Sequence, residues 1–221
     1  MDIFIKLSII IISYLIGSIP NGLLIGFFKG VDLRKEGSGN IGATNAGRVL
    51  GKIYAIITYA LDFIKAFIIV FLFNYNIIPI KYCILNPLLY GFIATIGHNY
   101  SIYLKFKGGK GVSAACGALS GYNILFLPLM MIIFFIIKKV SKLVSLSSLL
   151  TSLIVFIASI IVSISLKEFL ILDASKGLIG TFYRFNYIFI IILFLIVLII
   201  FIRHKDNIKR IIKNEEKPIN Y

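Results

Sequence analysis

The sequence has few charged residues and few side chains that bind metals or form disulfides. Charged residues make up 14% of the 221 positions, whereas soluble domains carry about 25%. The two cysteines, Cys83 and Cys116, lie in or beside apolar stretches without ligand spacing, so we assign them packing roles. Two histidines, two distant cysteines and scattered carboxylates are too few for a metal site. We therefore expect no metal and no other cofactor.

Apolar residues dominate instead, at 59% of the chain and a mean hydropathy of +0.99. A soluble domain of this length could not bury so much apolar surface, and a membrane-spanning helix needs about 20 apolar residues. We find no internal repeat and no low-complexity linker, which predicts a single all-α integral membrane domain over residues 1–221. Six long apolar stretches run over residues 3–28, 53–73, 86–104, 112–137, 143–166 and 186–202.

The net charge of +14 comes from 23 Lys and Arg against 9 Asp and Glu. In a soluble protein this excess would suggest a nucleic acid partner. Here most basic residues lie at the ends of apolar stretches, as cytoplasmic loops do under the positive-inside rule. We therefore expect no nucleic acid partner, and we place four basic intervals in the cytoplasm: 29–52, 105–111, 138–142 and the tail from Arg203.

Six crossings cannot place all four basic intervals on one side, because stretch 112–137 joins two of them. This stretch contains Gly117, Gly121, Asn123 and Pro128 near its middle. A break at Gly121-Tyr122-Asn123 would divide it into two short helices that enter the membrane and return. We therefore predict a bundle of about seven transmembrane helices, some short or broken, with the N-terminus outside and the tail in the cytoplasm.

The first polar segment, Gly37–Arg48, is rich in glycine and in neutral hydrogen-bonding side chains. Small residues allow backbone N–H groups to approach an anion closely, and an arginine offers a planar fork for phosphate. A flexible loop between helices is the alternative, but such loops seldom combine these residue types so densely. We predict phosphate binding by Ser38, Gly39, Asn40, Thr44, Asn45 and Arg48.

The second polar segment, Gly97–Ser113, contains His98 and the sequence Lys107-Gly108-Gly109-Lys110-Gly111. This cationic turn leads directly into an apolar stretch at Val112, so it lies at a helix N-terminus, where free N–H groups and the helix dipole favour an anion. Its spacing is not that of a Walker A loop. A basic loop with glycines as helix breakers is the alternative, and we favour phosphate binding.

Three further features give weaker evidence of function when each is considered alone. The tail segment Arg203–Arg210, which contains His204 and Asn207, is basic and could be only a topology signal. Asp62 and Lys65 are three residues apart inside an apolar stretch, which predicts an ion pair facing the bundle interior. Pro20, within Gly17–Gly22, predicts a kink in the first helix.

Together the three polar segments resemble the bacterial acyl-phosphate:glycerol-3-phosphate acyltransferases. The matching residues are Gly37–Asn45, Gly97–Gly111 and His204–Arg210, in that order, and the resemblance covers nearly the whole chain. One departure is Asn99-Tyr100-Ser101, where family members often have a Phe-Pro pair. The resemblance implies seven transmembrane helices, an external N-terminus and a cytoplasmic active site in a bacterial cell membrane.

The resemblance also implies the reaction, which is the first step of membrane phospholipid synthesis. An acyl phosphate would donate its acyl group to the 1-hydroxyl of sn-glycerol 3-phosphate, giving 1-acylglycerol 3-phosphate (lysophosphatidic acid) and phosphate. Neither acyl-CoA nor acyl carrier protein would be the donor. We expect the bilayer and these two substrates to be the partners of a monomer.

Two phosphate-bearing substrates require two cradles. We predict that Ser38, Arg48, His204 and Asn207, with Lys107 or Lys110, hold glycerol phosphate, and that Gly108, Gly109, Gly111 and the Gly37–Asn45 loop hold the acyl phosphate. The assignments could be exchanged. His98, Lys107 and Lys110 are the catalytic candidates, with His98 or a substrate phosphate oxygen as the base. We favour the substrate oxygen, because no carboxylate–histidine arrangement is visible.

Two other functions fit parts of the pattern. A transporter for an anionic metabolite would also use broken helices whose N-termini face an anion, but its two halves would show matching breaks and these halves do not. A non-catalytic lipid-binding subunit would not need so dense a cluster of Ser, Asn, Arg and Lys residues.

Overall fold

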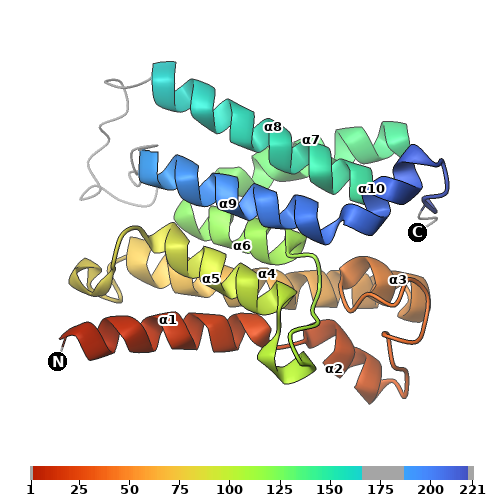
Figure 1. The fold of residues 1–221 in the computed structure, drawn as a ribbon, viewed down its shortest axis with the longest axis horizontal. Helices are drawn as coiled ribbons and strands as arrows, with labels where there is room; N and C mark the ends of the chain where they lie inside the picture. Colours follow the sequence, from red (N-terminus) through yellow and green to blue (C-terminus); the bar gives the residue numbers. More distant parts are fainter. Residues whose placement is uncertain (1, 166–186, 219–221) are drawn as a thin grey trace.

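The computed structural model describes residues 2–165 and 187–218, and every regular element in these ranges is helical. This confirms the predicted all-α fold (Figure 1). The polar interval 167–185 lies outside the described residues. The α-helices are α1 (Asp2–Ser18), α2 (Asn21–Phe28), α3 (Ala43–Leu50), α4 (Lys52–Asn74), α5 (Pro87–Asn99), α6 (Val112–Tyr122), α7 (Phe126–Ser141), α8 (Val144–Ser165), α9 (Tyr187–Arg203) and α10 (Lys205–Ile212), with short 3₁₀ turns at Ile80–Tyr82 and Ile102–Leu104.

Several helices have the length and composition of membrane spans. In the described ranges α4 and α8 qualify singly, and the bent pairs α1–α2 and α9–α10 qualify as broken spans. The first pair is bent by 40° at the predicted kink, where Pro20 lacks the N–H group that a continuous helix would use. These helices agree with a membrane bundle, while the number of seven crossings stays a prediction.

The predicted break in stretch 112–137 is confirmed. Helix α6 ends at Tyr122 and α7 begins at Phe126, while the Asn123 side chain accepts a hydrogen bond from the backbone N–H of Leu125. Lys110 before α6 and Lys138 near the end of α7 line the same cavity. The α6–α7 pair therefore enters the bundle and returns to the end where it started, as Figure 1 also shows.

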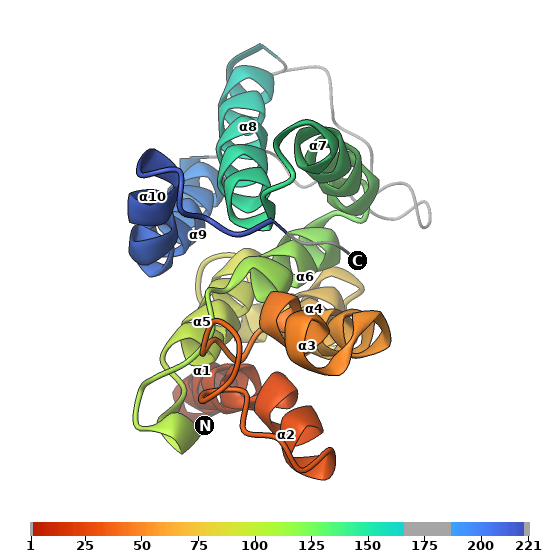
Figure 2. The same ribbon diagram turned by 90° about the vertical axis from the view of Figure 1, so that its right-hand side faces the viewer.

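Small residues allow the central helices to pack closely. A Cβ atom on Gly117 of α6 would collide with the backbone carbonyl of Phe63 on α4. Helices in membranes commonly approach through such small residues. Seen end-on, α6 separates α7–α10 from α1–α4, so it lies at the centre of the bundle (Figure 2).

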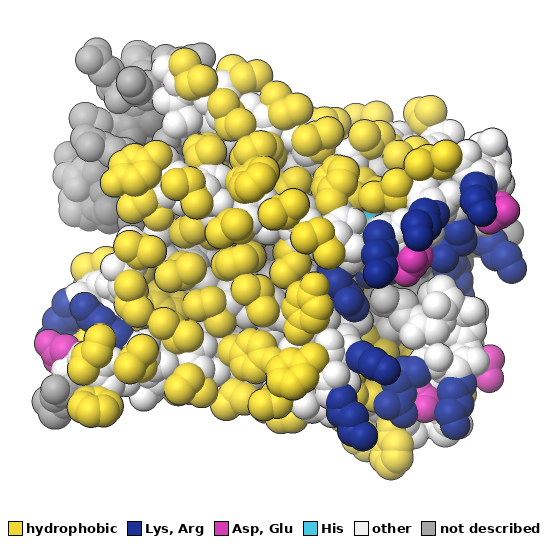
Figure 3. Space-filling view, viewed as in Figure 1, with side chains coloured by type: hydrophobic (Ala, Val, Ile, Leu, Met, Phe, Trp, Pro, Cys, Tyr) yellow, Lys and Arg dark blue, Asp and Glu magenta, His cyan; other side chains and the backbone are white. Residues whose placement is uncertain are grey.

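The surface divides into an apolar side and a basic end. Apolar side chains cover the face along the helices, whereas most Lys and Arg side chains on this face gather at one end of the bundle (Figure 3). We call this the basic end. Three of the basic intervals contribute Arg48, Lys110 and Lys138 to the lining of one cavity, and the tail residue Glu216 lines the same cavity. The apolar side and the basic end suit a protein that is held in lipid and has one strongly cationic surface.

Candidate active site

A cavity of about 420 Å³ extends into the bundle from the basic end. One part is polar, with side chains from the loop before α3, the turn before α6, α8 and the tail. The other part is apolar and lies among α4, α6, α7, α8 and α9. The polar part includes Ser38, Asn40, Thr44, Asn45, Arg48, His98, Lys110, Gly111, Ser145, His204, Asn207 and Glu216, and the apolar part includes Leu119, Met130, Met131, Phe134, Val155, Leu193 and Ile196.

Asn45 shapes the first polar segment rather than leaving its side chain available. It is 1% exposed, its Nδ2 donates to the carbonyls of Leu33 and Glu36 (both 3.0 Å), and its Oδ1 accepts from the Ser38 N–H (2.7 Å). These bonds fold the loop so that the Ser38 region and the first turn of α3 line the cavity. Arg48 follows one turn later and donates to the backbone carbonyl of Lys217 (3.0 Å).

Lys110 joins the second polar segment to the tail. Its Nζ donates to Oδ1 of Asn207 at 2.6 Å. Burial lowers the pKa of the Lys110 ammonium to about 8, while Glu216 opposes this shift and nearby arginines add to it. Gly111 has a φ of +83° and caps α6, whose first turn lines the cavity. A partly buried cation and a helix N-terminus therefore face the same space, as an anion site requires.

The glycine turn is held from outside the cavity. Arg203 donates from Nε to the Gly109 carbonyl (3.0 Å) and from Nη2 to the Gly108 carbonyl (2.7 Å). The Gly109 N–H donates in turn to the carbonyl of His98 (3.0 Å). These bonds fix the turn, and they occupy the Gly109 amide that we expected to face a phosphate.

Most of the predicted site residues line this one cavity, although they come from three distant segments. Those that line it are Ser38, Asn40, Thr44, Asn45, Arg48, His98, Lys110, Gly111, His204 and Asn207. Four others lie outside its lining: Gly39, Lys107, Gly108 and Gly109. Lys107 is exposed, so Lys110 is the lysine of this pair that reaches the cavity.

Glu216 connects α8 to the tail. Its Oε1 accepts from the Ser145 hydroxyl (2.7 Å) and from Nδ2 of Asn207 (2.6 Å), and its Oε2 accepts from Nε of Arg210 (2.7 Å). Burial raises the pKa of Glu216, but the hydrogen bonds from Arg210, Ser145 and Asn207 outweigh this and lower it overall. The carboxylate thus stays charged and orients the amide of Asn207 toward Lys110.

Comparison with known proteins decides the family. The sequence model of the family described as glycerol-3-phosphate acyltransferase matches residues 7–214. The chain belongs to this family. Glycerol-3-phosphate acyltransferases of Staphylococcus aureus strains RF122 / ET3-1 and Newman are each 38% identical to it over 218 residues, which cover 96% of both chains.

Two solved structures have the same fold as this acyltransferase. Both are crystal structures of PlsY (YgiH), an integral membrane glycerol 3-phosphate acyltransferase. The glycerol 3-phosphate form has a TM-score of 0.81 at 28% identity and covers 97% of this chain and 96% of its own. The lysophosphatidic acid form has a TM-score of 0.79 at 27% identity and covers 97% and 95%.

Sequence reasoning missed part of the acyltransferase cavity. A polar stripe on α8 lines it, formed by Ser145, Ser148, Thr151 and Ser152. Their spacing of three and four residues is that of one helix face, and it was visible inside the apolar stretch 143–166. Glu216 was also missed, although a carboxylate within a basic tail is a signal for an ion pair.

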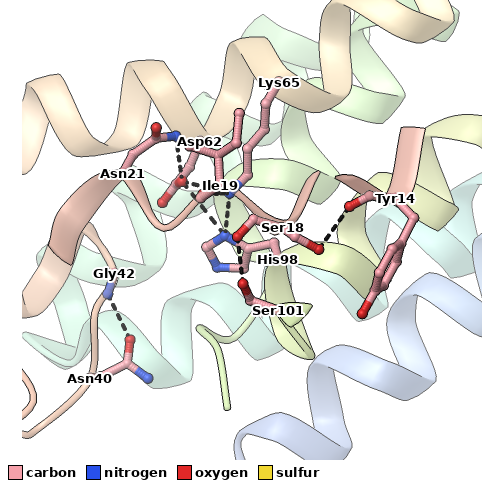
Figure 4. A network of polar contacts seen from close by, with 10 residues as sticks. All are labelled: Tyr14, Ser18, Ile19, Asn21, Asn40, Gly42, Asp62, Lys65, His98 and Ser101. Atoms are coloured by element: carbon pink, nitrogen blue, oxygen red, sulfur yellow. Dashed lines mark hydrogen bonds and ion pairs between the residues drawn. The ribbon is translucent and has the colours of Figure 1, made fainter. Parts of the chain in front are cut away.

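A buried polar network lies beside the cavity and confirms the predicted ion pair (Figure 4). Lys65 Nζ lies 2.9 Å from Asp62 Oδ1, and Asn21 donates to the same oxygen at 3.0 Å. Lys65 also donates to the Ile19 carbonyl in the α1–α2 break (2.9 Å). This network brings the kinked first span against α4, and His98 contacts it from α5.

Proposed function

We propose that this acyltransferase transfers the acyl group of an acyl phosphate to the 1-hydroxyl of sn-glycerol 3-phosphate. The products would be 1-acyl-sn-glycerol 3-phosphate (lysophosphatidic acid) and inorganic phosphate. One observation carries the proposal: a single cavity joins a cationic polar part to an apolar part. That combination suits two phosphate groups and one alkyl chain. Neither CoA nor acyl carrier protein is needed as a donor.

The placement of the polar groups supports the following residue roles. Ser38, Arg48, Lys110, His204 and Asn207 would hold glycerol phosphate, because they converge on the cavity from three segments. Arg48 contributes its planar fork, and Lys110 contributes a positive charge whose attraction for phosphate is less screened by water in a partly buried site. His204 is 3% exposed and its Nδ1 lies 2.8 Å from the Ile200 carbonyl, so its ring is held in place.

The acyl phosphate would occupy the remaining space. Its phosphate lies best near the first turn of α6, at Gly111, Val112 and Ser113, and near the loop ending at Thr44. Its alkyl chain would extend among the apolar side chains of α7 and α9, such as Met130, Phe134 and Leu193.

The reaction does not require covalent catalysis by the protein, because the acyl group is already activated as an acyl phosphate. The glycerol oxygen forms a bond to the acyl carbon, and the bond from that carbon to the phosphate oxygen breaks. The hydroxyl proton passes to an oxygen of the departing phosphate, so hydrogen phosphate leaves. Positioning and the stabilisation of negative charge then supply the rate, and Lys110 is the cation placed to do both.

The charge distribution supports one orientation in the membrane. Lys and Arg residues gather at the basic end (Figure 3), and positive loops stay in the cytoplasm. We propose a single-domain monomer in the bacterial cell membrane, with the N-terminus outside and the cavity and tail facing the cytoplasm. A tag after Tyr221 should be digested by protease in inverted vesicles and protected in right-side-out vesicles, and the reverse would contradict this orientation.

The reaction itself can be tested with purified protein in detergent or nanodiscs. Palmitoyl phosphate and glycerol phosphate are supplied together and separately, and released phosphate is measured. Release above the spontaneous hydrolysis rate should require both substrates. Equal release without glycerol phosphate would indicate an acyl phosphatase and would overturn the proposal.

A further inference from the structure

His98 lies between a charged network and the cavity. It is 6% exposed and occupies the last turn of α5. Its Nδ1 faces Asp62 and Lys65 of α4. Its Nε2 faces Gly109, where an added Cβ atom would collide with it. Among the residues that the structure describes, Nε2 has no hydrogen-bond partner, and the residue lines the cavity. One nitrogen thus contacts the charged network, and the other lies against the Gly109 turn, beside Lys110, which lines the cavity.

Lys65 decides which nitrogen of His98 carries the proton. An ammonium group has three donors and no acceptor. Its three contacts are Asp62 Oδ1 (2.9 Å), the Ile19 carbonyl (2.9 Å) and His98 Nδ1 (2.9 Å). Since the ammonium can only donate, Nδ1 must accept, and a neutral ring then carries its proton on Nε2.

Two other charges near the ring act in opposite directions: the Asp62 carboxylate attracts a second proton, and the Arg203 guanidinium repels it. Asp62 Oδ1 lies 3.6 Å from Nδ1, which is longer than a hydrogen bond, and it already accepts from Asn21 and Lys65. Arg203 of α9 is a second positive charge near the ring, because it donates a hydrogen bond to Gly109, which lies against His98. A second proton on Nδ1 would have to face the ammonium directly, so the imidazolium is disfavoured.

We propose that His98 acts as a permanent hydrogen-bond donor through Nε2–H, and that Lys65 is the positioning residue that holds it in this form. The inference rests on the proposed acyl transfer. The donor would serve a substrate oxygen that gains negative charge as the acyl carbon is attacked, as a preorganised donor does. His98 would then not take the hydroxyl proton, which passes to the departing phosphate.

Nitrogen NMR tests the tautomer directly, without any assay of activity. The chain has only two histidines, so ¹⁵N-histidine labelling gives two rings, which His204→Gln assigns. His98 should show a proton on Nε2 and a bare Nδ1. His204 should show the opposite, because its Nδ1 faces a carbonyl that can only accept. A bare Nε2 on His98, or an imidazolium at neutral pH, would overturn the proposal.

The role of Lys65 has its own spectroscopic test. In Lys65→Met the ammonium is gone, and His98 Nδ1 can take a proton beside Asp62. The bare-Nδ1 signal of His98 should therefore disappear, while the His204 signals stay unchanged. An unchanged His98 spectrum would show that Lys65 does not set the tautomer.

Replacement of His98 tests the catalytic role. A glutamine amide can supply a donor near the position of Nε2–H, whereas leucine supplies none and neither is a base. His98→Gln should keep kcat within about tenfold of the parent, and His98→Leu should lose about 100-fold or more, as oxyanion donors do. Equal losses in both variants, each still folded by size-exclusion chromatography, would contradict a donor role.

These outcomes are separable from failure of the proposed function. If the unaltered protein does not transfer acyl groups, the phosphate-release assay shows it before any variant is made. The NMR measurement uses the unaltered protein and decides the tautomer even if both His98 variants fail to fold.

Discussion

Lys110 provides the sharpest pH test, because burial lowers its pKa to about 8. The ammonium is charged below this pH and neutral above it. The charged fraction is about 90% at pH 7 and about 10% at pH 9 for such a group. If only the charged form binds glycerol phosphate, kcat/KM for this substrate should fall about tenfold between these values, since it follows ionisation in the free enzyme.

Two controls separate this effect from others. A phosphate monoester loses its second proton at about pH 6, so the substrate charge hardly changes between pH 7 and pH 9. Lys110→Arg keeps its charge at all these values and should show a flat profile, even if its overall rate is lower. The assay is phosphate release with palmitoyl phosphate held constant and spontaneous hydrolysis subtracted. A flat profile for the parent protein, or the same fall in the arginine variant, would refute the role of Lys110.

Three further variants test other parts of the site. Arg48→Ala should raise the KM for glycerol phosphate by about tenfold or more in the same assay, and an unchanged value would place Arg48 outside the site. Glu216→Gln removes the charge that connects α8 to the tail and should lower the temperature of half-inactivation. Glu215→Gln changes an exposed residue and should not, and equal effects would contradict the specific contact. Gly109→Ala places a methyl group against His98 and should abolish turnover in correctly inserted protein, whereas full turnover would contradict this close contact.

The broken helices could be predicted from the sequence, because their causes are local. Pro20 lacks the backbone N–H that a continuous helix would use. Gly121 and Asn123 interrupt an apolar stretch that cannot cross the membrane once, because both of its ends are basic and belong on the cytoplasmic side. The ion pair of Asp62 and Lys65 was equally local, since helical spacing alone brings the two side chains together.

The assembly of the site was predictable only in part. Phosphate-binding residue types marked three segments, and most of the marked residues do line one cavity. The sequence does not show which polar groups form hydrogen bonds within the protein, and the Asn45 amide bonds to the backbone of its own loop. It also did not separate Lys107 from Lys110. Lys105 and Phe106, just before these two lysines, have positive φ angles (52° and 61°) that turn the chain. After this turn, Lys110 lines the cavity and Lys107 does not.

The missed residues differ in where their hydrogen-bond partners lie. On α8 the hydroxyls of Ser148 and Ser152 donate to carbonyls of their own helix, whereas the partner of Ser145 comes from elsewhere in the chain. Ser145 meets Glu216, which is 71 positions away. The spacing of the α8 stripe was visible in the sequence, but a long-range contact leaves no local pattern, so the structure was needed to find the Ser145–Glu216 pair.

The most direct test of the account is the stoichiometry of the reaction with different donors. Purified protein is given labelled glycerol phosphate with palmitoyl phosphate, palmitoyl-CoA or palmitoyl-acyl carrier protein, and acylated glycerol phosphate and free phosphate are both measured. We predict one molecule of each product per turnover with palmitoyl phosphate and none with the other two donors. Acylation from either thioester at a comparable rate, or phosphate release without acylated product, would contradict the account.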